Sequence, residues 1–318
     1  MPELRLGPGR EFDRIRAMAA RWKDRARGLG DDCAFVESGG ERLAVSVDLS
    51  VEDVHFRRAW LTPAEIGYRA AAAALSDLAA VAAEPMALLL SVGVPADEAE
   101  MTLLGIADGV GDAAGDAGAL IVGGDLSTSA KLIVDVVVIG RASAEVRRSG
   151  AKPGDRIVVS GALGGPLAAL GAWQAGREPA PEARARFARP PTRHTTARFL
   201  ESHRARAMID ISDGLAADLG HLLAASGVGA RVDVTRIPVL AAAREAAARE
   251  GESAWRFAAR SGEEYELLAA MPPEAGDEVL AAAPVPLTVI GTIEAEPGLR
   301  AFDDAGEVTL PGGFDHFG

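Results

Sequence analysis

Aspartates interrupt the apolar runs of this chain, and these interruptions constrain what it can fold into more than any other sequence feature. Asp77 lies inside an alanine- and leucine-rich run over residues 70–83, and Asp125 closes the apolar run 119–124. A partly buried carboxylate must be paired, protonated or bound to a cation, because an isolated buried charge costs too much free energy. The sequence offers few basic residues beside these aspartates. Since hard divalent cations prefer oxygen ligands, the pattern predicts a Mg²⁺-dependent site that handles phosphates.

The composition is typical of a soluble enzyme with two domains. The chain has 318 residues, and only 5% of them are aromatic, so we expect cores built from Ala, Val and Leu. The single cysteine, Cys33, excludes an internal disulfide, and we expect it to be a small core residue. A formal charge of −13 makes nucleic acid and anionic membranes poor partners. We find neither a signal peptide nor a transmembrane run, and therefore expect a cytoplasmic location.

The first part of the chain alternates between helical and strand-like patterns. Thr62 is a plausible N-cap for a long helix that begins at Pro63. The pattern predicts helices over 11–26, 63–83 and 97–117, and strands over 33–37, 43–48, 88–94, 119–122 and 132–139. This alternation predicts an α/β or α+β domain over residues 1–141.

A second α/β domain is expected over residues 148–318, after a basic connector rich in turn residues at 147–155. The pattern predicts a helix through Trp173, a helix from Gly214, and strands over 156–160, 207–211, 230–234, 265–270 and 287–290. The segment 176–191 is rich in Pro and Arg, and we expect it to be a surface excursion.

Several common enzyme motifs are absent from the sequence. No P-loop is present, and the five histidines and one cysteine have no zinc-binding spacing. No nucleophile elbow for a Ser-His-Asp hydrolase occurs. The glycines over 109–115 superficially match a dinucleotide fingerprint, but they precede a strand and their spacing is one residue too long. A glycine-rich helix end is the favoured interpretation.

Nine segments in register resemble the thiamine-monophosphate kinase family, within the aminoimidazole-ribonucleotide-synthetase-like superfamily. The resemblance runs from about Gly28 to the last residues, and any one segment alone would be weak. The segments are Gly30-Asp-Asp-Cys-Ala, Ser46 to Phe56, Leu75-Ser-Asp-Leu-Ala-Ala80, Ala83-Glu-Pro85, Gly123-Gly-Asp125, Arg148 to Asp155, Ile209-Asp-Ile-Ser-Asp-Gly-Leu215, Ser261-Gly-Glu-Glu-Tyr-Glu-Leu267 and Gly313-Phe-Asp-His-Phe317.

The resemblance implies a fold, a reaction and an assembly. The fold would have two domains, with the N-terminal sheet completing a barrel across a homodimer and that domain binding ATP and Mg²⁺. The reaction would transfer the γ-phosphoryl group of ATP directly to the phosphate of thiamine monophosphate, giving thiamine diphosphate in the last step of its biosynthesis. Several Mg²⁺ ions would neutralise the two polyanions. The acceptor phosphate has a second pKa of about 6, so it is largely dianionic at neutral pH and needs no general base.

The resemblance also implies roles for particular residues. The positions that match magnesium ligands are Asp32, Ser46, Val47, Asp48, Asp77, Asp125, Asp210 and Asp213. The positions that match ATP-binding residues are Gly124, Asp125, Arg148 and Ser212. The positions that match residues near thiamine monophosphate are His55, Glu263 and Phe314, where a carboxylate and an aromatic face suit a cationic thiazolium.

Four positions depart from the family pattern, and each puts local geometry in doubt. Val47 replaces the usual Thr, which removes a side-chain oxygen and leaves only a backbone carbonyl as a ligand there. Asp53 stands where Gly is common, Leu126 where Thr is common, and Glu264 where Asp is common.

Simpler interpretations compete with these roles. The competing interpretations are a helix cap for Ser212 or Asp213, a turn residue for Asp31, an exposed helix residue for Asp77, a structural histidine for His55, a C-terminal anchor for Phe314 and a structural role for Asp135.

Two rival functions also stay open. One is another enzyme of the superfamily, such as an ATP-dependent ligase of purine synthesis, and the other is a non-catalytic binder of nucleotide or thiamine phosphates.

Overall fold

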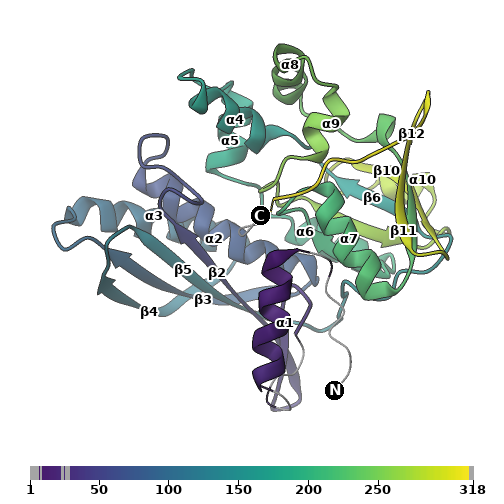
Figure 1. The fold of residues 1–318 in the computed structure, drawn as a ribbon. Coiled ribbons are helices and arrows are strands. Elements are labelled where there is room, and N and C mark those ends of the chain that lie inside the picture. The colour runs from purple at the N-terminus through teal and green to yellow at the C-terminus, as the bar shows by residue number, and fades with distance from the viewer. Residues whose placement is uncertain (1–6, 8, 23–24, 26–28, 315–318) are drawn as a thin grey trace.

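The computed structural model describes residues 7, 9–22, 25 and 29–314. Its first helix, α1 (Arg10–Trp22), lies beside the rest of the molecule, and Phe12 packs against His221 of α7 (Leu215–Ser226) with ring centroids 4.2 Å apart (Figure 1). The predicted helix 11–26 is therefore confirmed as far as Trp22, and most of its last turn lies outside the described residues. In the described part of the chain, no helix combines the length and apolar character needed to cross a membrane.

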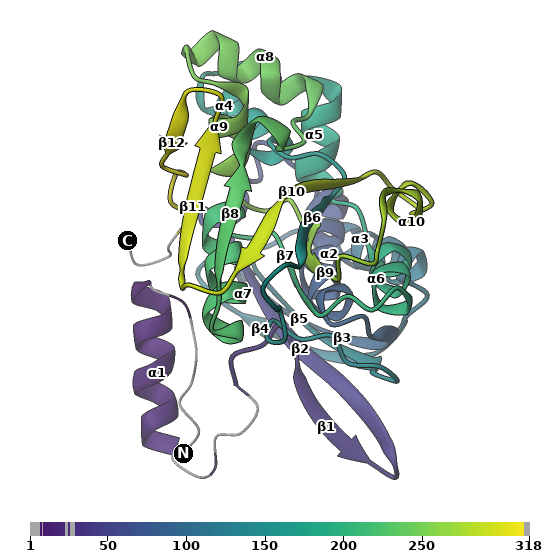
Figure 2. The same cartoon turned by 90° about the vertical axis from the view of Figure 1, so that its right-hand side faces the viewer.

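The N-terminal sheet has five strands, and two helices lie on it. The strand order is β1 (Ala34–Ser38), β2 (Glu41–Val51), β5 (Ile133–Arg141), β3 (Glu84–Val94) and β4 (Leu120–Thr128), and the helices are α2 (Pro63–Ala80) and α3 (Glu100–Ala117). The pairing is antiparallel except between β3 and β4. Figure 2 shows β1 and the adjoining part of β2 projecting from the sheet as a hairpin.

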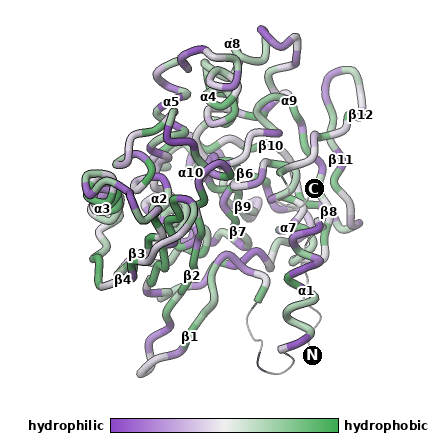
Figure 3. Tube along the Cα trace, turned by 60° about the vertical axis from the view of Figure 1, so that its left-hand side comes forward, coloured by the Kyte–Doolittle hydropathy of each residue, from purple (hydrophilic) through white to green (hydrophobic). Residues whose placement is uncertain are grey.

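Helix α2 begins at a capping box, as the sequence predicts. The Thr62 hydroxyl accepts from the backbone N–H of Glu65, and the Glu65 carboxylate accepts from the N–H of Thr62. Fourteen of its 18 residues are buried, because α2 contacts β2 and β5 on one side and β7 (Ala207–Asp210) and α6 (His194–Ser202) on the other. A helix that is apolar all round is typical of such a central position. Figure 3 shows the hydrophobic colour along α2 and the strands beside it.

The C-terminal sheet has seven strands of mixed direction. Its strands, in spatial order, are β12 (Gly306–Val308), β11 (Gly298–Asp303), β8 (Gly229–Asp233), β10 (Leu287–Glu294), β6 (Arg156–Ser160), β9 (Leu267–Met271) and β7. The other helices here are α4 (Gly165–Gln174), α5 (Pro181–Ala188), α8 (Ala241–Glu250), α9 (Ala254–Ala259) and α10 (Asp277–Ala281). The sequence patterns missed β11, β12 and α8 to α10. Where predicted, the strands of this domain are confirmed to within a few residues.

The prediction of a surface excursion over residues 176–191 is correct for most of residues 176–182, which are exposed, and wrong for the rest. The segment contains α5, which buries Phe187 against the domain boundary. Trp173 connects this helix to the N-terminal domain, because its ring stacks on Trp60 and meets the edge of Phe187. The arginines that gave the segment a polar appearance are used in ion pairs, such as Arg184 with Glu65 of α2. Composition alone could not distinguish these paired arginines from solvated ones.

Of the glycines over 109–115, Gly109 serves the packing of two helices. It lies so close to α2 that a Cβ there would sit 1.8 Å from the carbonyl oxygen of Ala64. A Cβ at Gly67 of α2 would sit 2.1 Å from the carbonyl oxygen of Ile106. Gly111 and Gly115 have open space around them. The resemblance to a dinucleotide fingerprint is therefore explained by the contact between α2 and α3.

We predict that Gly109→Ala lowers the free energy of unfolding by about 3 kcal/mol, since backbone atoms of α2 must move to admit the methyl group. Gly111→Ala is the matched control in the same helix, and it should raise the free energy of unfolding by about 0.5–1 kcal/mol. Urea denaturation of both variants measures the difference. Equal effects of the two substitutions would contradict the proposed close contact.

Candidate active site

Three of the predicted carboxylates meet at the boundary between the two domains. Asp32 precedes β1, Asp77 lies on α2, and Asp210 ends β7. One oxygen from each lies within 4.8 Å of the other two. Asp32 and Asp210 are buried and Asp77 is partly buried. The interpretation of Asp77 as an ordinary exposed helix residue is therefore wrong.

The carboxylates have unequal partners. Arg148 donates two hydrogen bonds to Asp32, from Nε at 3.1 Å and from one terminal nitrogen at 2.7 Å. Asp77 accepts from the hydroxyl of Ser46, and Asp210 accepts from the hydroxyl of Ser76 at 2.6 Å. One arginine thus faces three carboxylates, and Asp77 and Asp210 are bonded to neutral hydroxyls.

This shortage of positive charge changes the protonation of the carboxyl groups. Burial, followed by the charges of Asp210 and Asp32, raises the pKa of Asp77 well above its usual range. Burial and the charge of Asp32 raise the pKa of Asp210 to about 7. Burial raises the pKa of Asp48 to about 6. Such a set of oxygen ligands fits a hard divalent cation, which would replace the protons and balance the charge.

A cavity of about 520 Å³ lies beside this cluster and between the domains. Asp32 and Ser46 contact residues of its wall, and Asp31 lies in the wall and accepts the backbone N–H of Arg148 at 3.2 Å. The predicted site residues that line it are Val47, Asp48, His55, Asp77, Arg148, Asp210, Ser212, Asp213, Glu263 and Phe314. The structure thus gathers most of the predicted site from both domains.

Gly124 and Asp125 do not join this group within one chain. Gly124 lies in one row of the sheet with Asp48, but β5 and β3 separate their strands. Three strand spacings amount to about 14 Å. Both residues are exposed on β4, which pairs only with β3 among the described strands. Neither residue lines the cavity between the domains.

The helix-cap interpretation of Ser212 and Asp213 is wrong. The N-cap of α7 is Gly214, and it has no side-chain cap bond. Instead, the buried carboxylate of Asp218 reaches back and accepts the backbone N–H groups of residues 212, 213 and 214 at 3.0–3.2 Å. The sequence analysis missed Asp218, although an acid in the first turn of a helix is a signal for this arrangement. This cap orders the loop that holds Ser212 and Asp213 in the cavity wall.

His55 and Phe314 each combine a structural contact with a place in the wall. Nδ1 of His55 accepts the backbone N–H of Val51 at 3.0 Å. The backbone N–H of Phe314 donates to the carbonyl of Asp213 at 2.9 Å, while the residue is 58% exposed. Its aromatic ring is therefore not buried in the core as an anchor. Residues 315–317 of the predicted motif 313–317 lie outside the described residues.

The four departures from the family pattern have visible structural settings. Asp53 has a φ of 65°, which explains a preference for Gly there, and Asp is among the residues that tolerate this conformation. The buried Glu264 carboxylate accepts from the backbone N–H of Gly164 and from the guanidinium of Arg186. Val47 is 60% exposed on β2 and Leu126 is 60% exposed on β4. Asp135, on β5, stays outside the carboxylate cluster, as expected.

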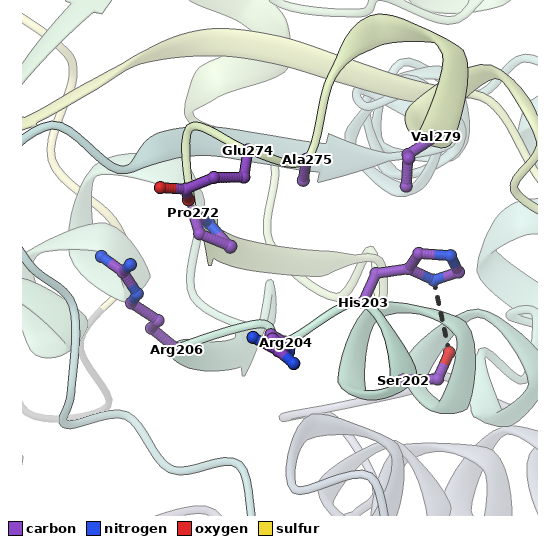
Figure 4. A pocket seen from close by; sticks show the side chains of 8 residues that line it. All are labelled: Ser202, His203, Arg204, Arg206, Pro272, Glu274, Ala275 and Val279. Atoms are coloured by element: carbon purple, nitrogen blue, oxygen red, sulfur yellow. Dashed lines mark hydrogen bonds between the residues drawn. The ribbon is translucent and has the colours of Figure 1, made fainter.

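A second cavity of about 520 Å³ lies at the end of α6 (Figure 4). His203, Arg204 and Arg206 lie on one side of it, and Glu274 and Pro272 lie on the other. Arg206 is paired with Asp155 at 2.6 Å. None of the predicted site residues lines this cavity, so the cavity between the domains is the candidate active site.

Comparison with known proteins defines the class of the protein. The model of the AIR synthase related protein N-terminal domain matches residues 30–142, and that of the C-terminal domain matches residues 152–304. The chain therefore has the two-domain α/β fold of the AIR synthase related proteins, with mixed sheets.

More specific relatives place the chain within that class. The thiamine-monophosphate kinase of Escherichia coli K12 is 37% identical over 326 residues, covering 97% of this chain and 96% of the relative. That of Pyrococcus horikoshii is 36% identical, covering 91% and 90%. A solved structure of AaThiL complexed with AMPPCP and TMP has a TM-score of 0.88 and 30% identity, and covers 100% of this chain and 99% of its own. The chain belongs to the thiamine-monophosphate kinase family.

We predict that Asp77→Asn stabilises the metal-free protein, and more so at pH 8 than at pH 5. A carboxyl group whose pKa is raised on folding destabilises the folded state as the pH rises from the unfolded pKa, near 3.9, through the folded pKa. Removing this charge should raise the free energy of unfolding by about 1–3 kcal/mol at pH 8. Thermal denaturation in EDTA at both pH values measures the gain.

Asp108→Asn, on the exposed face of α3, is the control and should give no such pH-dependent gain. Added Mg²⁺ should raise the melting temperature of the parent and of Asp108→Asn, but not of Asp77→Asn. A variant that is less stable than the parent at both pH values would show that Asp77 has a packing role instead.

Proposed function

We propose that this chain is a thiamine-phosphate kinase, which transfers the γ-phosphoryl group of ATP directly to thiamine monophosphate and forms thiamine diphosphate. One observation carries the proposal most directly: a single cavity has the carboxylates of Asp77 and Asp210 in its wall together with Arg148, His55 and Glu263. This combination suits a substrate with a polyanionic part and a cationic ring. The family membership of the chain supports the same reaction.

The acidic part of the cavity is the proposed place for Mg²⁺ and the phosphates. Bound Mg²⁺ would neutralise the phosphate charges and orient the transferred group. Arg148 suits a phosphate as a fork of N–H donors, and Ser212 and Gly124 are proposed to contact ATP with it. The proposed magnesium ligands are Asp32, Ser46, Val47 through its carbonyl, Asp48, Asp77, Asp125, Asp210 and Asp213.

The remaining part of the cavity is the proposed place for the organic part of thiamine monophosphate. A cationic thiazolium would be attracted to the carboxylate of Glu263 and to the ring of Phe314. His55 would contact the substrate without removing a proton, because its Nδ1 is used by Val51 and the acceptor phosphate is already dianionic. Chemistry without a general base is consistent with a site built from carboxylates, hydroxyls and one arginine.

A homodimer is part of the proposal, because one chain alone leaves the site incomplete. Asp125 would reach the cavity from β4 of the second copy, which is the only way to reconcile its proposed role with the strand order. Strand β4 and part of β2, which lie on opposite sides of β5 and β3 in the sheet, have apolar side chains that a single chain leaves exposed. These exposed side chains are Val47, Leu49, Leu120, Ile121, Val122 and Leu126. Joining two sheets into one barrel would cover them.

Two further assignments remain proposals from the sequence. We assign ATP and Mg²⁺ binding and dimer formation to residues 1–141, and a second α/β domain to residues 148–318. We assign the enzyme to the cytoplasm, as its single buried cysteine suits a reducing compartment.

The reaction predicts a clear order of acceptors. With ATP and Mg²⁺, the purified protein should convert thiamine monophosphate to thiamine diphosphate, and thiamine should be a poor acceptor because its hydroxyl needs a base. Mass spectrometry identifies the products. Asp77→Asn should lose more than about 100-fold in kcat/KM, while Asp108→Asn should retain it. Equal phosphorylation of thiamine would contradict the mechanism, and binding without turnover would favour the non-catalytic rival.

The proposed dimer predicts the effect of a charge at the β4 edge. The parent should sediment as a dimer at micromolar concentration, and Val122→Lys should shift it to a monomer with little kinase activity, since a buried lysine without a partner is unfavourable. Met101→Lys replaces another exposed apolar residue, on α3, and should leave the dimer intact. A fully active parent monomer would contradict the shared site.

A further inference from the structure

Arg69 is a buried arginine at the boundary between the two domains. It lies on α2 two turns before Asp77, and it is only 3% exposed. Although Arg69 does not line the cavity, it contacts a residue that does. No sequence pattern selects this residue, because arginine is a common helix former.

The guanidinium of Arg69 is held from two elements of the C-terminal domain. One terminal nitrogen donates to the carbonyl of Phe187 on α5 at 2.6 Å, and the guanidinium carbon lies 3.9 Å from the centre of the Phe187 ring. The other terminal nitrogen forms an ion pair with Oε1 of Glu263. With a hydrogen bond, a ring contact and an ion pair, the planar guanidinium of Arg69 has little freedom to turn.

Glu263 is itself held in an unusual backbone conformation. Its φ is 58°, in the left-handed region that few residues other than Gly adopt, and its backbone N–H donates to the carbonyl of Ser212 at 2.6 Å. Tyr265, two residues later, has a φ of 52°. Strained backbone of this kind persists where surrounding contacts determine it, and it is concentrated at functional sites. The loop therefore presents the Glu263 side chain to the cavity at a backbone cost.

We propose that Arg69 is a positioning residue that fixes the carboxylate of Glu263 in the wall of the cavity. The proposal rests on the proposed function, in which Glu263 attracts the cationic ring of the substrate. Without Arg69, the partly exposed carboxylate can take other rotamers, and its charge is no longer presented at one place. Arg69 thus acts on the thiamine part of the substrate through Glu263 and has no direct contact with ATP.

A purely structural role for Arg69 must be distinguished from this one. The pair of Arg184 with Glu65 also joins α2 to α5, with nitrogen–oxygen distances of 2.5 and 3.0 Å, but it does not involve Glu263. Arg184→Gln is therefore a control for the loss of an arginine contact between α2 and α5.

The experiment is a double-mutant cycle on the full-length enzyme. We expect Glu263→Gln to raise KM for thiamine monophosphate about 10- to 100-fold and to leave KM for ATP within about 2-fold. Arg69→Gln should give a similar rise for the same substrate. The double variant should match Glu263→Gln within about 2-fold, because Arg69 acts only through Glu263. Arg69→Lys should recover part of the loss, since it keeps the charge but not the fork.

Several results would overturn the proposal. Arg69 would be a structural residue if the rises in KM for thiamine monophosphate multiplied in the double variant, or if Arg69→Gln raised KM equally for both substrates. The same conclusion would follow if Arg184→Gln also raised KM for thiamine monophosphate and not for ATP. An unchanged KM for thiamine monophosphate in Glu263→Gln would instead contradict the proposed roles of both Glu263 and Arg69. The kinase activity of the parent enzyme is measured separately, so this result would not contradict the proposed function. If Arg69→Gln does not fold, Arg69→Lys alone and combined with Glu263→Gln completes the same cycle.

Discussion

Helix α2 is packed on two sides, and the rest of the molecule depends on this packing. Its alanines let the N-terminal sheet approach on one side, and β7 and α6 approach on the other. Gly67 and Gly109 bring α3 into backbone contact with it. Because this one rigid helix packs against both domains, Ser76 and Asp77 meet Asp210 without depending on loop positions. From the same helix, Arg69 reaches Glu263 in the wall of the cavity.

The carboxylate cluster works against the stability of the fold that holds it. Asp32 has Arg148 as a partner, but burial and mutual repulsion raise the pKa of Asp77 and Asp210. A cation that binds the folded state would remove this repulsion, so ligand binding and stability are linked. Loss of stability at a functional site is a common trade-off in enzymes. The extensive burial of α2 is what allows the chain to sustain it.

Elements with strong local signals were predictable from the sequence, and those made by distant contacts were not. The start of α2 followed from Thr62 and Pro63, and the apolar runs of β3 and β5 marked them as strands. In contrast, β11 is stabilised mainly by pairing with β8 and β12, which no local pattern reveals. Helix α5 was mistaken for a surface segment because its arginines are used in ion pairs with partners far away in the sequence.

The sequence by itself determined which residues could do the chemistry, since aspartates within apolar runs must be paired, protonated or bound to a cation, and the ordered motifs identify the family. Only the tertiary structure decided which of them meet. Asp77 and Asp125 have similar local settings, yet Asp77 joins Asp32 and Asp210 while Asp125 lies on the far edge of the sheet. Strand order and helix docking arise from contacts between distant segments, so they cannot be read from neighbouring residues. The contact of Arg69 with Glu263, across the domain boundary, was decided in the same way.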